Sequence, residues 1–353
     1  MKLLPAAATA GLLVSIAWIL PLEAHKPITS PYTFAEDVAP ILRERCATCH
    51  VAGGPAPMPL TTAEETVPWG ESIRLELVAG HMPPWSAISG GKRLPHAEGL
   101  TARELNVLLT WVTGGTPPGD AKPAPPAPSS PAWPLGAPDL TLSLPEATVA
   151  ADQGEVTREI VLPLDAAARR PLRAVDLKPG TRTLVRSAQI LIKTAGQDPG
   201  AERLLTLWVP GDVPIALPNG VTYNVPADAQ LLVRMRYKKT WEHEREAMSD
   251  RSELGLYFAP QGAEVVRLST DLERFGLRVL SVYPAAGAAG RRLTLDARLP
   301  NGDTRRLIEF TARPGWDRRY AFDPPLNFPA GTQLRASDPN ALVVDVAAAP
   351  LID

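Results

Sequence analysis

The sequence predicts a multidomain chain in which a small helical domain is followed by a larger, antiparallel all-β region. Helix caps and apolar residues at helical spacing are confined to the first third of the 353 residues. After a proline-rich stretch, short runs of β-branched and alternating apolar residues recur, with turn signals between them. Because helices and strands occupy separate parts of the chain, we expect separate domains.

The first 24 residues have the pattern of a signal peptide. Lys2 provides a short positive region, residues 3–22 form a mostly apolar run, and Ala24 offers a small residue for cleavage. The run approaches the ~20 apolar residues of a membrane-spanning helix. An uncleaved anchor is therefore the alternative, but internal proline and glycine residues favour the signal peptide. We expect an exported, periplasmic protein that contacts a membrane only if residues 1–24 are retained.

Residues 25–115 are expected to form the helical domain. Gly114 and Gly115 end the last helix, whereas Pro40 and Pro68 interrupt the first two, so those helices are kinked or begin later. Each of the three predicted helices begins with a threonine followed three residues later by a glutamate, as in a capping box: Thr33 with Glu36, Thr61 with Glu64, and Thr101 with Glu104.

Both cysteines of the chain lie in the stretch "RERCATCHVAGG", residues 43–54. A disulfide between Cys46 and Cys49 would close a very small loop and restrain the unfolded chain little. Zinc would need a second pair of ligands, and a redox dithiol would need a βαβ setting. In C-x-x-C-H, by contrast, two thiols add to the vinyl groups of a haem and the adjacent histidine binds its iron. We therefore expect one covalent haem c, with Cys46 and Cys49 as thioethers and His50 as an axial ligand.

A methionine thioether as sixth ligand would raise the reduction potential into a range suited to electron transfer. Met82, in "GHMPPW", is the preferred candidate because its distance along the chain lets it reach the opposite face of the haem. Met58, in "APMPL", is the alternative and lies only eight residues beyond His50. His81 would instead give a bis-histidine haem of lower potential.

Residues 116–138 form a proline-rich linker, which we expect to be extended and semi-rigid. The β region after it is expected to divide near Pro260 into two sandwiches, residues 139–260 and 261–353. Strands are predicted at residues 157–164, 183–194, 204–210, 230–237, 252–260, 277–284, 291–300 and 305–312.

The chain resembles a known family in several stretches. "YTFAEDVAPILRERCATCHVAGGPAPMPL", "HMPPW" and "LLTWVTGGTPPGD" resemble the monohaem cytochrome c modules that bacteria fuse to a copper type II, ascorbate-dependent monooxygenase-like region. "VPADAQLLVRMRY", "DRSELGLYFAP" and "GWDRRYAFDPPLNFPAGTQLR" resemble that second region, which has the paired jelly-roll fold of peptidylglycine hydroxylating monooxygenase. The resemblance implies an all-α cytochrome c domain followed by jelly-roll-like antiparallel sandwiches, and it covers nearly all of the mature chain.

The copper ligands that this resemblance implies are missing from the sequence. Arg186 and Ser187 stand where relatives carry a histidine pair, and Arg236 stands where they carry a histidine before tyrosine. Ala285 to Gly287 replace a His-x-His. Because type II copper takes imidazole and thioether ligands, we expect no copper and no catalytic residue in the β region.

Two further histidines could contribute to a metal site. His243 lies among glutamates, a pattern more typical of a charged hairpin loop than of a metal site. His25 would become the N-terminal residue after cleavage and could chelate copper together with a second histidine, but a disordered terminus is the simpler interpretation.

Charge limits the partners that we expect. The net charge of −2 gives no reason to expect nucleic-acid binding. Residues 26–120 carry seven basic and ten acidic side chains, which favours a periplasmic redox partner with a basic docking face. The arginine pairs 291–292, 305–306 and 318–319 could bind an anionic surface, although solvated strand ends explain them more simply.

These observations favour an electron carrier whose degenerate monooxygenase-like β region serves as a docking or scaffold module. The alternatives are a haem-fed copper oxidoreductase, and a sensor or structural module of a periplasmic assembly.

Overall fold

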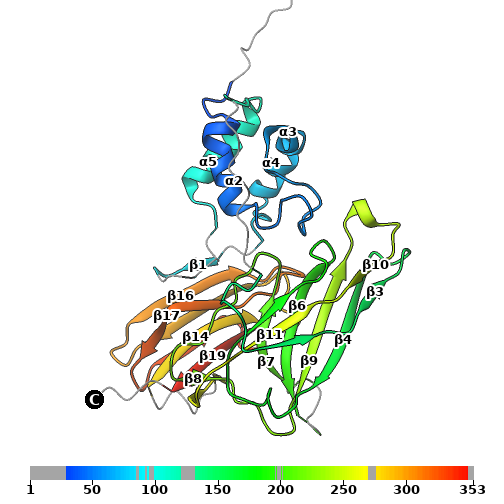
Figure 1. Cartoon of the computed structure of the whole chain (residues 1–353). Helices are drawn as coiled ribbons and strands as arrows, with labels where there is room; N and C mark the ends of the chain where they lie inside the picture. Colours follow the sequence, from blue (N-terminus) through cyan, green and yellow to red (C-terminus); the bar gives the residue numbers. More distant parts are fainter. Residues whose placement is uncertain are drawn as a thin grey trace, which may run out of the picture.

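The computed structural model describes most of the chain after its N-terminal stretch (Figure 1). The predicted signal peptide, His25, His96 and part of the predicted linker lie outside the described residues. Within them, no helix combines the length and apolar composition that crossing a membrane requires. The described residues are 29–84, 87–91, 94, 99–120, 132–194, 196, 200, 202–268 and 276–348.

Short helices form the N-terminal segment, residues 29–120, which lies above the β region in Figure 1. They pack around Trp111, which is fully buried and has the ring of Phe34 5.9 Å away. The bounds are Phe34–Val38 for the π-helix η1, Ala39–Arg45 for α2, Ala63–Thr66 for α3, Val67–Trp69 for the 3-10 helix η2, Gly70–Val78 for α4 and Ala102–Thr113 for α5.

Two of the three predicted helix starts are confirmed. The Thr33 hydroxyl accepts a hydrogen bond from the Glu36 amide, and Thr101 forms a reciprocal capping box with Glu104. The start predicted at Thr61 is wrong by one residue, because the capping box belongs to Thr62 and Glu65. The Glu65 carboxylate accepts the amides of both threonines, so either spacing could satisfy the sequence pattern.

The predicted fold class, with its separate all-α cytochrome c domain, is wrong. The structure is mostly β, with 38% strand and 15% helix, and the helices are short. Residues inside the expected helical domain also form strand β1 (Ala87–Ser89), which pairs antiparallel with β16 (Thr304–Thr311). The physical reason is that β16 would otherwise present unpaired backbone groups at a sheet edge, and β1 satisfies them. The N-terminal segment is thus joined to the β region by a shared sheet.

The first β unit surrounds one large apolar core that contains Leu231, Val233, Met235 and Leu254, all fully buried. One of its sheets has the strand order β4-β9-β6-β7 and another the order β2-β11-β5, and β3 pairs with β10. The strands are β2 (Leu140–Ser143), β3 (Ala147–Val149), β4 (Glu155–Pro163), β5 (Leu172–Lys178), β6 (Val185–Lys193), β7 (Arg203–Trp208), β8 (Val221–Thr222), β9 (Gln230–Lys238), β10 (Met248–Asp250) and β11 (Glu253–Phe258).

The second β unit has a core of its own, which includes Val279, Leu295 and Ile308. Its sheets have the strand orders β13-β19-β14-β17 and β1-β16-β15-β18. The remaining strands are β12 (Ala263–Glu264), β13 (Val266–Arg267), β14 (Leu277–Pro284), β15 (Arg292–Arg298), β17 (Tyr320–Phe328), β18 (Gln333–Ala336) and β19 (Leu342–Ala348).

A buried arginine fastens the two β units together. Arg319, directly before β17, donates to the Leu205 carbonyl oxygen at 2.5 Å and to the Tyr223 hydroxyl at 2.7 Å. Its guanidinium also lies 3.3 Å from the carboxylate of Asp345. Strand β8 of the first unit pairs in parallel with β12, which adds a backbone connection between the units.

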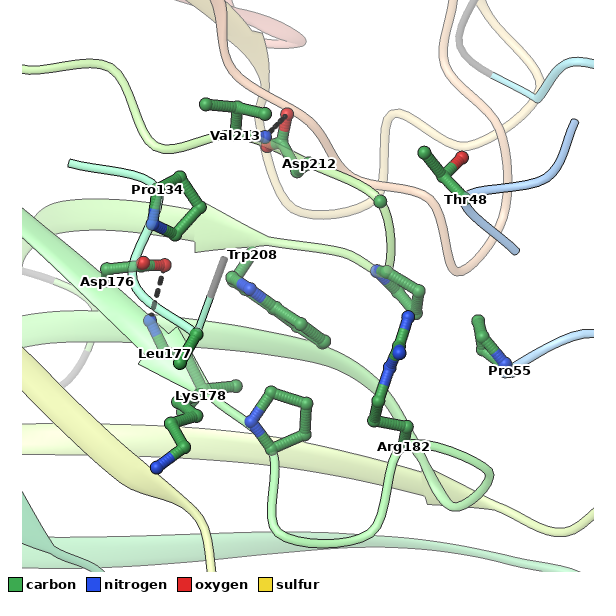
Figure 2. A pocket seen from close by; sticks show the side chains of 14 residues that line it. Thr48, Pro55, Pro134, Asp176, Leu177, Lys178, Arg182, Trp208, Asp212 and Val213 are labelled. Atoms are coloured by element: carbon green, nitrogen blue, oxygen red, sulfur yellow. Dashed lines mark hydrogen bonds between the residues drawn. The ribbon is translucent and has the colours of Figure 1, made fainter. Parts of the chain in front are cut away.

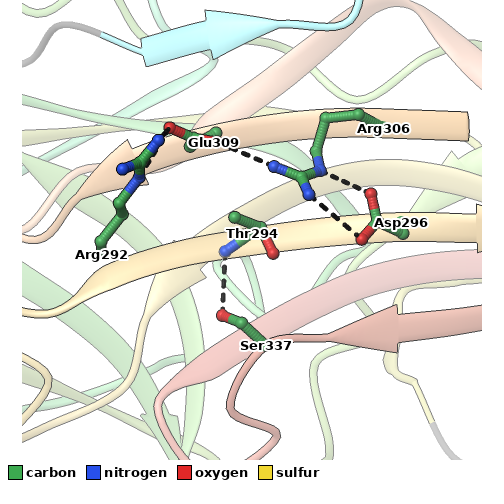
Figure 3. A network of polar contacts seen from close by, with 6 residues as sticks. All are labelled: Arg292, Thr294, Asp296, Arg306, Glu309 and Ser337. Carbon is green, nitrogen blue, oxygen red and sulfur yellow. Dashed lines mark hydrogen bonds and ion pairs between the residues drawn. The ribbon is translucent and has the colours of Figure 1, made fainter.

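Most arginines of the pairs that could have bound an anionic surface form ion pairs within the chain, at the surface for Arg291, Arg292 and Arg306 and in the interior for Arg318 and Arg319. Arg306 and Arg292 both contact Glu309 on β16, and Arg306 also contacts Asp296 on β15 (Figure 3). Arg318 pairs with Asp212 at 2.7 Å. The pairs 291–292 and 305–306 thus lie at or near strands at the surface, as the simpler interpretation predicted, whereas Arg318 and Arg319 are buried.

Candidate functional site

The C-x-x-C-H motif forms a tight turn directly after α2. The backbone amide of Cys46 donates to Leu42 at 2.8 Å and so continues the helix by one residue. The amides of Cys49 and His50 then donate to the Cys46 carbonyl oxygen at 3.1 and 2.9 Å. This turn places Cys46, Cys49 and His50 within one short, hydrogen-bonded stretch of backbone.

Both thiols are shielded from water. Cys49 is buried and Cys46 is half-buried against the apolar cluster of the N-terminal segment. Burial raises the pKa of Cys46 to about 12 and that of Cys49 to about 11. Both cysteines are therefore thiols at neutral pH, which argues against a reactive dithiol because such chemistry needs a lowered thiol pKa.

His50 is oriented by a backbone carbonyl group. Its Nδ1 atom lies 3.0 Å from the Met58 carbonyl oxygen. Because a carbonyl oxygen only accepts hydrogen bonds, Nδ1 carries the proton and Nε2 keeps its lone pair. Burial lowers the pKa of His50, which favours the neutral ring. A neutral imidazole whose Nδ1 is held in this way is the usual arrangement for a metal ligand.

The two candidate methionines occupy different environments. Met58 packs against the same apolar cluster as Cys46, and its backbone lies on the Nδ1 side of the His50 ring. Met82 lies in the loop after α4, outside that cluster, with 39% of its surface exposed. His81, next to it, is exposed and its Nδ1 lies 3.1 Å from a Glu76 carboxylate oxygen. Met82 is therefore more accessible to an incoming cofactor than Met58 is.

The motif turn packs directly on the first β unit. The Cys49 thiol lies 3.6 Å from the Pro210 carbonyl oxygen, in the loop after β7. At the next residue, Gly211, an added Cβ would lie 3.1 Å from the Thr48 hydroxyl and 3.4 Å from the Cys49 sulfur. The absence of a side chain at Gly211 thus allows the close approach of this loop to the motif.

A cavity of about 300 Å³ lies between the motif turn and the first β unit (Figure 2). Thr48 and Pro55 line it from the N-terminal segment, and Trp208 and Arg182 line it from the β unit. The aromatic ring and the guanidinium group give the cavity both an apolar wall and a positive charge.

Asp176 also lines this cavity, and its carboxyl group has an unusual pKa. Its carboxylate accepts a hydrogen bond of 2.7 Å from the backbone amide of Leu177 (Figure 2). Burial, with a smaller contribution from the nearby carboxylate of Asp212, raises its pKa to about 7. Asp176 therefore changes charge close to neutral pH.

The positions expected to have lost copper ligands hold ion pairs and turns. Arg236 donates to Glu155 at 2.6 Å and reaches the Gly315 carbonyl oxygen at 3.4 Å. Residues 285–287 form a turn after β14. His243 ends the short 3-10 helix η3 (Trp241–His243), and its Nδ1 lies 3.2 Å from a Glu246 carboxylate oxygen. Among the described residues, no three histidine, cysteine, aspartate or glutamate side chains form a group that could hold a metal.

No protein-family model matches the sequence, and a comparison with curated proteins found no match.

Sequence reasoning missed the residues that the β region contributes around Cys49. Arg182, Arg186 and Arg318 come from separate loops and strands, and their charges lower the pKa of the Cys49 thiol against the larger effect of burial. The sequence contains no motif that joins these positions. Only the docking of the N-terminal segment on the β units brings them together.

Proposed function

We propose that this chain binds one haem c covalently and transfers single electrons in an exported compartment. The observation that carries the proposal is the C-x-x-C-H turn, in which two shielded thiols are followed by an imidazole held by the Met58 carbonyl group. Two thiols and a free imidazole nitrogen are the donor set of a c-type haem.

Each residue of the turn would have a distinct role. Cys46 and Cys49 would form the thioether bonds, and His50 would bind the iron through Nε2 while Met58 holds its Nδ1 proton. Met82 would be the second axial ligand, because its thioether is open whereas the Met58 backbone lies on the His50 side. A bound haem would supply a reversible one-electron couple.

The β region would then act as a docking or scaffold module related to copper monooxygenases. The loop at Pro210 and Gly211 touches the motif, so this region shields one side of the attachment turn. Arg236 occupies an expected copper position and is paired with Glu155, which supports a scaffold without copper catalysis.

A basic partner protein fits the charge of the N-terminal segment. Exposed carboxylates on its surface include Glu44, Glu71 and Glu76. This docking mode predicts that the rate of electron transfer with a basic redox protein falls as salt is added.

Covalent attachment can be tested directly. The full-length precursor is expressed in a periplasm with haem-attachment machinery. The molecular mass of the purified protein is then measured under denaturing conditions. We expect one retained haem per chain, less in Cys46→Ala and Cys49→Ala, and none in the double variant. Thr48→Ser serves as the matched control and should retain the haem. A wild-type chain that carries no haem under these conditions would disprove the proposal.

A further inference from the structure

The cavity between the motif turn and the first β unit has walls that suit a small ligand. Its volume of about 300 Å³ lies at the lower end of the range for small-molecule sites, so a single ring with short substituents fits it. Four prolines line the cavity: Pro55, Pro134, Pro179 and Pro210. Because proline fixes its own φ angle, these walls are stiff, and their shape is largely set before a ligand enters.

Trp208, the last residue of β7, forms an apolar wall of the cavity. Its side chain is half-buried, because part of it packs against the core of the first β unit and the rest lines the cavity. Its indole N–H has no hydrogen-bond partner among the residues that the structure describes, although a tryptophan N–H usually finds one when it is buried. Trp208 thus offers a ligand both an aromatic face and a hydrogen-bond donor.

Arg182 supplies a positive charge at the cavity. Its side chain is exposed, and it forms no ion pair within the described part of the chain. In the view of Figure 2, the Trp208 indole lies between the guanidinium group of Arg182 and the carboxyl group of Asp176. A guanidinium group binds a carboxylate through two parallel N–H donors. A ring that stacks on Trp208 can therefore direct a carboxylate towards Arg182.

The other charged groups that line the cavity are neutralised or change their charge with pH. Lys178 pairs with Glu253 at 2.8 Å, and Asp212 pairs with Arg318 at 2.7 Å. Asp176 holds its proton below its pKa of about 7. The cavity therefore keeps a positive charge below pH 7, and that charge is offset as Asp176 ionises.

We propose that this cavity binds a small aromatic carboxylate, whose ring stacks on Trp208 and whose carboxylate is held by Arg182. The site is independent of the proposed function, since neither the two cysteines nor His50 line the cavity. Thr48 does line it, so a bound ligand lies against the motif turn as well as against the first β unit.

Benzoate is the probe, and its binding to the full mature chain is measured by isothermal titration calorimetry at pH 6. We expect one benzoate per chain, and an affinity that is lower by roughly tenfold in Arg182→Gln, which loses a charge-assisted hydrogen bond. Arg169→Gln is the matched control, because Arg169 is also exposed but does not line the cavity. Absence of benzoate binding to the wild type, or equal affinities of the two variants, would overturn the inference.

Two further probes separate the ring from the charge. Cyclohexanecarboxylate keeps the carboxylate but cannot stack, and benzyl alcohol keeps the ring but carries no charge. Both should bind more weakly than benzoate, and Trp208→Leu should remove the preference for benzoate over cyclohexanecarboxylate. If Trp208→Leu does not fold, the comparison of the probes in the wild type and in Arg182→Gln decides. Equal binding of benzyl alcohol and benzoate would mean that the cavity does not recognise a carboxylate.

Asp176 provides a readout that a chance surface contact would not give. Its carboxyl group ionises near pH 7, and its negative charge then repels the carboxylate of the ligand. Benzoate should therefore bind more weakly at pH 8 than at pH 6, whereas Asp176→Asn should bind it equally at both values. A wild type with the same affinity at both pH values would contradict the placement of the ligand between Asp176 and Arg182.

Discussion

The Nδ1 atom of His50 lies 3.0 Å from the carbonyl oxygen of Met58, and this contact connects the two ends of the motif loop. The contact fixes which nitrogen carries the proton, and it also fixes the side of the ring on which the Met58 backbone lies. The Leu60 amide adds a second connection, since it donates to the His50 carbonyl oxygen at 3.0 Å. The loop from His50 to Leu60 therefore acts as a support for the imidazole.

This relationship predicts different outcomes for the two methionines. Met58→Ala keeps the backbone carbonyl group, so the haem-loaded variant should retain the weak near-infrared sulfur-to-iron band. Met82→Ala should lose that band, because it removes the thioether that we assign as ligand. His81→Ala, which removes the neighbouring imidazole, serves as the control and should leave the band unchanged. Loss of the band in Met58→Ala alone would exchange the roles of the two methionines.

The local features of this chain could be predicted from its sequence, because they depend on neighbours in the chain. The cap at Thr101 and the helix end at Gly114 are both found as predicted. The motif turn at Cys46 likewise needs only local hydrogen bonds. The shift from Thr61 to Thr62 shows the limit of such reasoning where two threonines share one glutamate.

Features that depend on docking between distant segments could not be predicted. Strand β1 has only three residues and no alternating pattern, and it is a strand because β16 offers a free edge. For this reason the prediction of a separate all-α domain is wrong. The electrostatic effect of Arg182 and Arg186 on the Cys49 thiol was missed in the same way, since it joins residues more than 130 positions apart.

Gly90 should be essential for the pairing of β1 with β16. A Cβ at this position would lie 1.9 Å from the Arg306 carbonyl oxygen, a backbone atom that cannot move aside cheaply. We expect Gly90→Ala to lower the free energy of unfolding by about 1–3 kcal/mol, as overpacking typically does, and to expose β16 amides to hydrogen exchange. Gly154→Ala is the control, because a Cβ there meets no atom within 4 Å. Unchanged exchange in β16 would show that β1 contributes nothing to that edge.

Gly211 offers a test of the contact between the motif turn and the first β unit. Gly211 and Gly220 both have a φ of +79°, so alanine is strained equally at the two positions. Only at Gly211 would the new Cβ approach Thr48 and Cys49. We expect Gly211→Ala to increase proteolysis of the motif turn more than Gly220→Ala does. Identical cleavage of the two variants would mean that the β unit does not shield the turn.

Asp176 should make the free energy of unfolding depend on pH, and the variant Asp176→Asn should lack this contribution. Its pKa of about 7 in the folded chain lies well above the ordinary value of about 3.9. Below about pH 4 both the folded and unfolded chains hold the proton, so the shift has no effect.

Between about pH 4 and pH 7 the unfolded chain has lost this proton while the folded chain keeps it, so stability falls as the pH rises. Asp176→Asn cannot titrate and escapes this fall. At pH 8 the variant should therefore exceed the wild type by up to a few kcal/mol, since one pKa unit corresponds to about 1.4 kcal/mol. Denaturant unfolding between pH 4 and pH 8 measures the difference, with the exposed Asp228→Asn as control. Parallel stability curves for Asp176→Asn and the wild type would mean that water reaches this carboxylate and that the cavity beside the motif is wetter than its walls imply.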